Sequence, residues 1–120
     1  MEQEFLLKEL CISYQEIIRT QVIYLGSNST ITSDAGNQTV SGTINGAHTL
    51  GITPAANWTQ SGNIGATTAP TQLTIGTTSS TGDVTLSGTT TVSGAVTVYG
   101  DDITLSENIN TSAGGANGDV

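Results

Sequence analysis

Cationic side chains are nearly missing from this chain of 120 residues, which has two Lys or Arg residues against ten Asp or Glu residues. Both cations, Lys8 and Arg19, lie near the start, and the formal net charge is −8. Nucleic acids and anionic membrane surfaces attract proteins through clustered Lys and Arg side chains. The sequence therefore predicts no nucleic-acid partner and no direct insertion into a membrane.

Cysteine, histidine and aromatic residues are also scarce, with one Cys, one His and 4% aromatics. A single cysteine excludes a disulfide within the chain and any metal site built from several cysteines. One histidine leaves few ways to assemble a nucleophile with its base or a general acid with its partner. We therefore expect no enzyme activity, no catalytic residue and no bound cofactor.

Short apolar–Thr–apolar triplets are what the chain has in abundance between Gly82 and Ile109. The clearest are Val84–Leu86, Val96–Val98 and Ile103–Leu105, each followed within two residues by Ser or Gly. This alternation predicts short β-strands. Disorder is the alternative for a chain so rich in Thr, Ser and Gly, but disordered chains seldom alternate apolar residues regularly. No such strand buries a face alone, so we expect the strands to stack into an all-β, parallel β-solenoid.

Internal repeats support stacking. Thr-Val-Ser-Gly occurs at residues 39–42 and 91–94, with the variants Thr-Gln-Ser-Gly at 59–62 and Thr-Leu-Ser-Gly at 85–88. The irregular spacing indicates a degenerate solenoid. Its aliphatic core is expected to contain one or two inward side chains per strand, namely Val40, Ile44, Ile64, Ile75, Val84, Leu86, Val92, Val96, Val98, Ile103 and Leu105.

Residues 1–24 differ from the rest, because they contain no Gly, Pro, Asn or Asp. Leu6, Leu7, Leu10 and Tyr14 recur at steps of three and four residues, which predicts an amphipathic helix over residues 4–19. Such a helix could cap the first turn of the solenoid, or the segment could be an unrelated leader. Its acidic start does not match a secretory signal peptide.

Two regions follow from this division: a capping helix or leader at 1–24, and a repeat region at 25–120. Gly-Asp-Val at 82–84 recurs at 118–120, so the last residues look like the start of another turn. The repeat region is therefore expected to be a fragment of a longer array.

Residues 26–120 contain the stretches TGDVTLSG and GAVTVYGDDITL. They resemble the repeats of filamentous-haemagglutinin-like large exoproteins and autotransporter passengers of bacteria. The resemblance implies a right-handed parallel β-helix, exported to the cell surface as a stalk or adhesin piece. It transfers no binding residue.

The repeat region has one acidic cluster in the sequence. It consists of Asp101, Asp102 and Glu107, together with Asp83. Solvated carboxylates at the corners of the solenoid are the simplest interpretation. A weak Ca²⁺ site is the alternative, because Ca²⁺ prefers hard oxygen ligands, and Asp101, Asp102 and Glu107 are its candidates.

These patterns together predict a non-enzymatic, extracellular, adhesive or structural module of a bacterial surface exoprotein. The expected partners are glycans or proteins of a host or neighbouring cell, together with end-to-end self-association. Two alternatives remain: a fragment of a carbohydrate-active β-helix enzyme, and an ice-binding solenoid. Ice binding needs Thr-x-Thr stacked turn after turn, and residues 30–32 and 89–91 fit that pattern.

Overall fold

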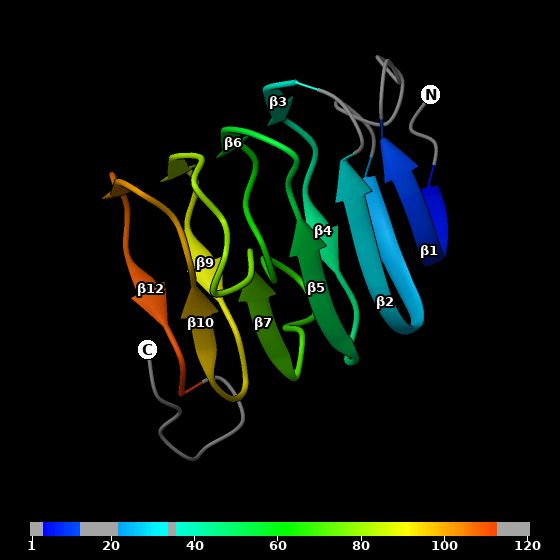
Figure 1. The fold of residues 1–120 in the computed structure, drawn as a ribbon. Coiled ribbons are helices and arrows are strands. Elements are labelled where there is room, and N and C mark those ends of the chain that lie inside the picture. Colours follow the sequence, from blue (N-terminus) through cyan, green and yellow to red (C-terminus); the bar gives the residue numbers. More distant parts are fainter. Residues whose placement is uncertain (1–3, 13–21, 34–35, 113–120) are drawn as a thin grey trace.

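The computed structural model describes residues 4–12, 22–33 and 36–112. Within them the protein is an all-β parallel β-solenoid of about 4 turns, which confirms the predicted fold class. Figure 1 shows the strands side by side along the coil, from β1 near the N-terminus to β12 near the C-terminus. Most turns of the coil are closed by short corners rich in Gly, Ser and Asn, which tolerate tight backbone bends.

Three rows of parallel strands form the walls of the coil. The long sheet has the order β1 (Glu4–Ile12), β2 (Val22–Ser33), β5 (Thr49–Thr53), β7 (Gln72–Ile75) and β10 (Val96–Val98). The four-stranded sheet has the order β11 (Ile103–Leu105), β8 (Val84–Leu86), β6 (Trp58–Gln60) and β3 (Gln38–Val40). The short row consists of the first part of β2, β4 (Ile44–Asn45), the isolated bridge at Ile64, β9 (Thr90–Thr91) and β12 (Ile109–Asn110).

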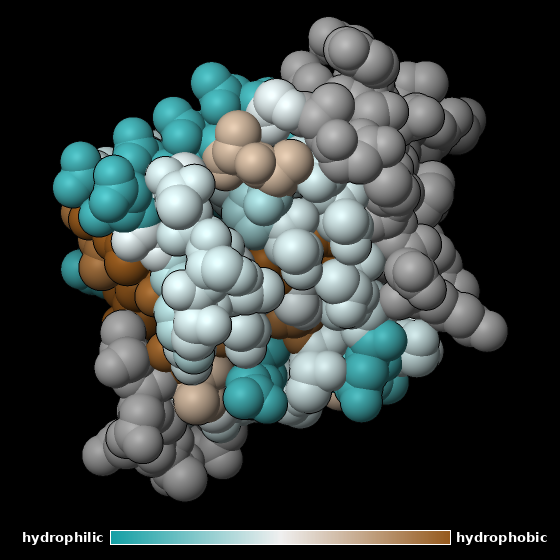
Figure 2. Space-filling view, in the orientation of Figure 1, coloured by the Kyte–Doolittle hydropathy of each residue, from teal (hydrophilic) through white to brown (hydrophobic). Residues whose placement is uncertain are grey.

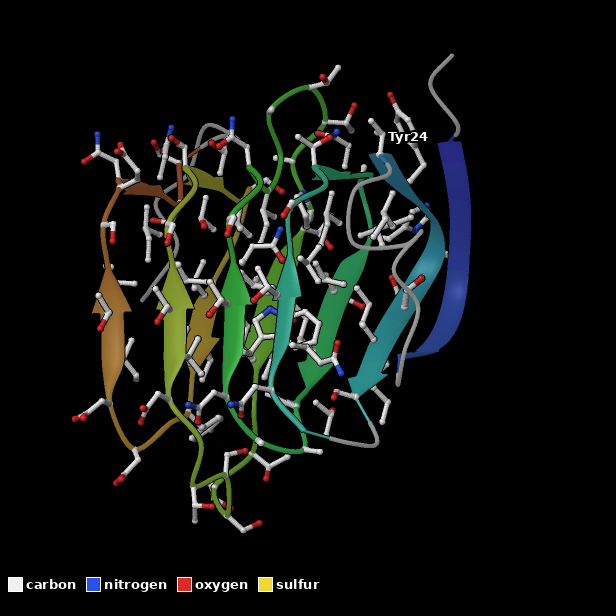
Figure 3. All side chains as sticks on the ribbon, turned by 90° about the horizontal axis from the view of Figure 1, so that it is seen from above. Tyr24 is labelled. Carbon is white, nitrogen blue, oxygen red and sulfur yellow. The ribbon has the colours of Figure 1, made fainter. Side chains whose placement is uncertain are left out.

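Alternation within most of the short strands sends apolar side chains inward and Thr side chains outward. In β8, Val84 and Leu86 are buried while Thr85 is half-buried on the outer side. The inward side chains of both sheets form one core cluster, and Figure 3 looks onto the four-stranded sheet with the long sheet behind it. Trp58 is fully buried among them, so the single Trp of the chain is a core residue.

Most of the predicted core is confirmed: Val40, Ile44, Ile64, Ile75, Val84, Leu86, Val92 and Val96 are all at most 1% exposed. Val98 is half-buried against the core. The prediction is wrong for Ile103 and Leu105, which are 45% and 49% exposed. Both occupy inward register positions, opposite Val84 and Leu86, but β11 is the edge of its sheet among the described strands. Because no described strand lies beyond β11, these two side chains stay largely exposed.

The predicted N-terminal helix is wrong for residues 4–12, which form strand β1, and residues 13–21 lie outside the described residues. Strand β1 pairs in parallel with β2, with one register shift between Leu7 and Glu9. Phe5 and Leu10 are thereby in register with Ile23 and Ile31. The apolar spacing of this segment fits a strand with one irregularity as well as a helix. Pairing of the backbone with the exposed edge of β2 then favours the strand.

The repeats align differently from what their letters suggest. Residues 39–42, 59–62 and 85–88 all begin inside strands of the four-stranded sheet and are in register from turn to turn. Residues 91–94, which have the same four letters as 39–42, leave β9 in the short row instead. The two identical segments, 39–42 and 91–94, therefore lie on different walls of the coil. The segments that repeat the structure of 39–42 are the variants at 59–62 and 85–88.

Candidate functional site

A six-residue repeat organises the outer face of the four-stranded sheet. Each turn contributes Asn or Asp, an inward residue, Thr, a second inward residue, Ser, and then Gly or Glu. The four copies begin at Asn37, Asn57, Asp83 and Asp102 and are held in register by the strand pairs. The outer face therefore carries three parallel columns of side chains, one of Asn and Asp, one of Thr and one of Ser.

The first column is a hydrogen-bonded ladder, which we call the corner ladder (Asn37, Asn57, Asp83, Asp102). Asn37 Oδ1 accepts a bond of 3.1 Å from the Asn57 backbone N–H, and Asn57 Oδ1 accepts one of 2.9 Å from Asp83. Asp83 Oδ1 accepts the next, at 3.3 Å, from the Asp102 N–H. The bonded residues are 20, 26 and 19 positions apart, so the ladder keeps its register through turns of unequal length.

The corner ladder gives two of the acidic residues a structural role. Asp83 and Asp102 occupy ladder positions, whereas Asp101 and Glu107 are exposed and flank β11 at its two ends. In the described part of the chain, no group of three or more His, Cys, Asp or Glu side chains lies close enough to hold a metal ion. The calcium site at Asp101, Asp102 and Glu107 stays a prediction. Sequence analysis missed the ladder, although Asn or Asp two residues before each Thr was its signal.

Substitution at Asp83 tests the ladder. Asp83→Ala removes the acceptor for the Asp102 N–H and should lower the free energy of unfolding by about 1 kcal/mol. Asp83→Asn keeps an acceptor at the same place and removes one of two carboxylates on adjacent turns, so it should be neutral or stabilising. Urea unfolding of both variants measures the difference. Equal destabilisation by Ala and Asn would show that the ladder bond contributes nothing to stability.

The second column is a rank of four threonines, Thr39, Thr59, Thr85 and Thr104, paired directly with one another across β3, β6, β8 and β11. Thr39 and Thr104 are exposed, and the other two are half-buried. Adjacent strands lie about 4.8 Å apart, so the hydroxyl and methyl groups of this Thr rank repeat at that interval. The result is a regular polar surface on the outer face of the four-stranded sheet.

The two Thr-x-Thr segments noted in the sequence do not form such ranks. Thr30 and Thr32 of β2 are in register with Gly51 and Thr53, so the pattern loses one Thr on the next turn. Thr90 is buried, and Thr91 is in register with Asn110. The regular Thr surface lies on the four-stranded sheet, where each strand carries one outward Thr.

Apolar surface gathers at one end of the coil. Figure 2 shows it in brown at the end where Figure 1 places β12. Ile103, Leu105 and Tyr99 are the exposed large hydrophobic residues of the described chain. Ile103 and Leu105 belong to the edge strand β11, which pairs only with β8 among the described strands. End-to-end self-association through this edge stays a prediction.

The described part of the chain contains no helix that could span a membrane. Comparison of the chain with protein-family models, with curated proteins and with solved structures found no match.

Proposed function

We propose that the chain is a non-enzymatic structural and adhesive module of a bacterial exoprotein, displayed outside the cell. The observation that carries the proposal is the six-residue repeat on the four-stranded sheet. It places Thr, Ser and Asn or Asp side chains in columns over four successive turns. A rigid surface with the same polar groups at regular intervals suits shallow, multivalent contact with glycans or proteins of another cell.

The solenoid architecture supports a structural role in the same module. Parallel turns share one continuous apolar core, from Ile23 of β2 to Val96 of β10, so the wall is stiff along the coil axis. Stiffness keeps the outer columns in fixed geometry, and a fixed geometry reduces the entropy lost when several contacts form at once. The resemblance of residues 26–120 to the repeats of bacterial exoproteins agrees with this proposal.

Adhesion of beads tests the proposal. Fluorescent beads coated densely with the purified chain should adhere to cultured epithelial cells or to bacterial cells, whereas the soluble chain should bind them weakly, because only the beads are multivalent. Beads coated to the same density with an unfolded variant, Val96→Asp, are the matched control. Adhesion no greater than that of the control on every cell type would contradict the proposal. Polysaccharide cleavage lost on changing Asp101 or Asp102 to Ala would replace it with the enzyme alternative.

Ice binding is the second candidate, and the Thr rank favours it. Four threonines in register present hydroxyl and methyl groups at a regular spacing on one wall of the coil. If this surface orders water, the chain should inhibit ice recrystallisation, and Thr59→Tyr should abolish the inhibition by breaking the Thr rank. Thr97→Tyr, an outward change on the long sheet, is the control and should keep it. No inhibition by the wild-type chain would exclude this candidate.

A further inference from the structure

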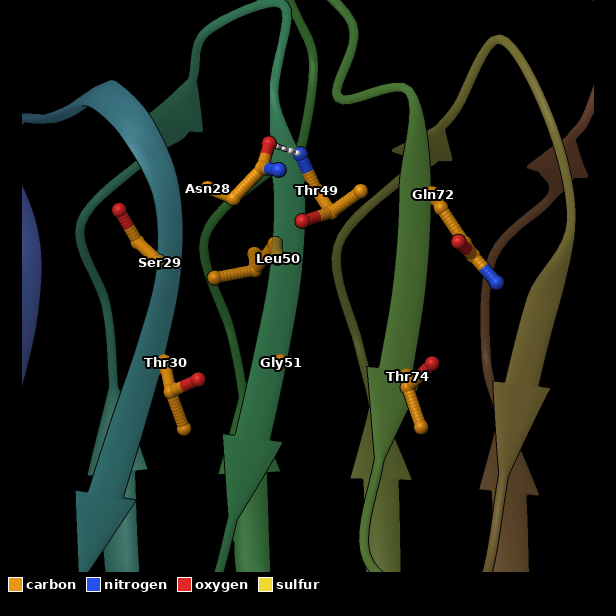
Figure 4. A pocket seen from close by; sticks show the side chains of 8 residues that line it. All are labelled: Asn28, Ser29, Thr30, Thr49, Leu50, Gly51, Gln72 and Thr74. Atoms are coloured by element: carbon orange, nitrogen blue, oxygen red, sulfur yellow. Dashed lines mark hydrogen bonds between the residues drawn. The ribbon is translucent and has the colours of Figure 1, made fainter.

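A hollow of about 300 Å³ lies on the outer side of the long sheet, across strands β2, β5 and β7 (Figure 4). We call it the Gly51 hollow. Its lining consists of Asn28, Ser29, Thr30, Thr49, Leu50, Gly51, Gln72 and Thr74. Figure 4 shows two levels of outward side chains, with Asn28, Thr49 and Gln72 at one level and Thr30 and Thr74 on either side of Gly51 at the other.

The hollow exists because one column of threonines is interrupted. Thr30 of β2 pairs with Gly51 of β5, Gly51 pairs with Thr74 of β7, and Thr74 pairs with Thr97 of β10. Three of these four positions carry a Thr side chain that stands out from the wall. At Gly51 the side chain is missing, so backbone forms a floor between Thr30 and Thr74.

The fold does not require glycine at position 51. Between positions 46 and 100, a Cβ added at any other glycine would come within 3.0 Å of a backbone atom. At Gly51 the nearest atom to an added Cβ is Thr30 Oγ1 at 3.5 Å, an ordinary van der Waals contact. Its φ is not in the left-handed region that favours glycine. Glycine inside a strand weakens the strand, and it often marks a place where a ligand approaches the backbone. The space above Gly51 is therefore not required by packing and is open to a ligand.

The chemistry of the lining indicates an uncharged ligand with many hydroxyl groups. The lining contains three Thr hydroxyls, two carboxamides and no charged side chain. Asn28 is held in place, because its Oδ1 accepts a hydrogen bond of 3.0 Å from the Thr49 backbone N–H. Thr30 and Gln72 are exposed, so their polar groups can reach a ligand above the floor. The volume is at the small end for ligand sites, which suits one ring and not a folded partner.

We propose that the Gly51 hollow binds one neutral pyranose unit of a polysaccharide. The ring lies over Gly51, with its hydroxyls bonded to Thr30, Thr74 and the carboxamide of Gln72. This inference rests on the proposed adhesive function and names the ligand class of one contact site. A shallow site with neutral hydrogen bonds gives weak affinity, in the millimolar range, and multivalent display raises it.

Amide NMR shifts with defined oligosaccharides test the site. The probes are maltotriose, cellotriose, xylotriose, β-1,4-galactotriose and chitotriose, with trigalacturonate as the charged counterpart. At least one neutral trimer should shift amides in the segments 28–30, 49–51 and 72–74 in a saturable manner. Trigalacturonate should shift them less, because the lining offers no cation to its carboxylates.

Three variants assign the binding to the hollow. Gly51→Thr fills the space above the backbone, and its Cβ comes no closer to a backbone atom than 3.9 Å, at Ser29 O. It should weaken the affinity at least tenfold, with a melting temperature equal to or above that of the wild type. Thr74→Val removes one hydroxyl and should weaken it about three- to tenfold. Thr97→Val is the matched control, because Thr97 is also a half-buried, outward, mid-strand residue of the long sheet but does not line the hollow. It should bind like the wild type.

Two results would overturn the inference: no neutral trimer shifting these amides, or Gly51→Thr binding as tightly as the wild type. The bead assay separates this failure from failure of the adhesive function. If beads carrying Gly51→Thr adhere like wild-type beads, adhesion does not depend on the hollow. Wild-type beads that do not adhere would refute the adhesive function, even if a trimer occupies the hollow.

Discussion

Val96→Asp should unfold the solenoid, with the free energy of unfolding reduced by about 3 to 5 kcal/mol. Val96 is 1% exposed and lies in register with Leu73, which is fully buried. A carboxylate at this position would lose its hydration, and no cation exists between residues 20 and 120 to pair with it. Circular dichroism during urea unfolding measures the loss.

The neighbouring residue provides the control for this experiment. Thr97 points outward from the same strand and is half-buried. Thr97→Asp should therefore change the free energy of unfolding by no more than about 0.5 kcal/mol. Equal tolerance of Asp at positions 96 and 97 would contradict the inward and outward assignment of β10, and with it the stacked core.

Gly88→Ala should also destabilise the solenoid, with a loss of about 1 to 3 kcal/mol in the free energy of unfolding. A Cβ at Gly88 would lie 2.5 Å from the carbonyl oxygen of Gly62 on the previous turn. Gly62 stands in the same relation to Gly42, so the corner after the four-stranded sheet brings backbone against backbone on successive turns. The added methyl group must push two turns apart, and thermal unfolding should show a lower melting temperature.

Gly51→Ala is the matched control, because it adds the same methyl group to a glycine of the same solenoid. Its Cβ would come no closer to another atom than 3.5 Å, at Thr30 Oγ1. Alanine restricts the unfolded chain more than glycine does, so this variant should be as stable as the wild type or more stable by about 0.5 to 1 kcal/mol. If Gly88→Ala were tolerated as well as Gly51→Ala, the close approach of turns at the Gly corner would be wrong.

These two experiments also bear on the proposed function. The outer columns of Thr and Ser keep a regular spacing only while successive turns stay in register. The shared apolar core holds that register inside the coil. At the corners, the close contact between glycines of successive turns holds it as well. A variant such as Gly88→Ala that loosens the stacking should therefore weaken bead adhesion even where the chain remains folded.

The N-terminal segment shows how a local pattern can mislead. Leucines three and four residues apart predicted a helix, yet Glu4–Ile12 is a strand paired with β2. In the strand, which contains one register shift, Phe5 and Leu10 are in register with the buried residues Ile23 and Ile31. Spacing alone cannot distinguish these outcomes. The neighbouring sheet edge, which exists only in the folded chain, determines which backbone hydrogen bonds form.

The core shows the opposite failure, in which polar residues occupy inward positions. Gln60 is 1% exposed and in register with Leu86, and its Nε2 donates to the carbonyl oxygens of Gly42 and Gly62, both at 3.2 Å. Sequence analysis left Gln60 out because Gln is polar. Alignment of Thr-Gln-Ser-Gly with Thr-Leu-Ser-Gly would have placed it correctly.

The sequence by itself determined the class of the fold, because alternating apolar and Thr residues in strands too short to bury a face can only be satisfied by stacking. It also determined most of the core, since Val, Ile and Leu at alternate positions have one buried side. The tertiary structure decided which turn lies over which, because register depends on contacts between residues 19 to 26 positions apart. That register creates the corner ladder, the Thr rank and the Gly51 hollow, and it leaves Ile103 and Leu105 exposed on an edge strand.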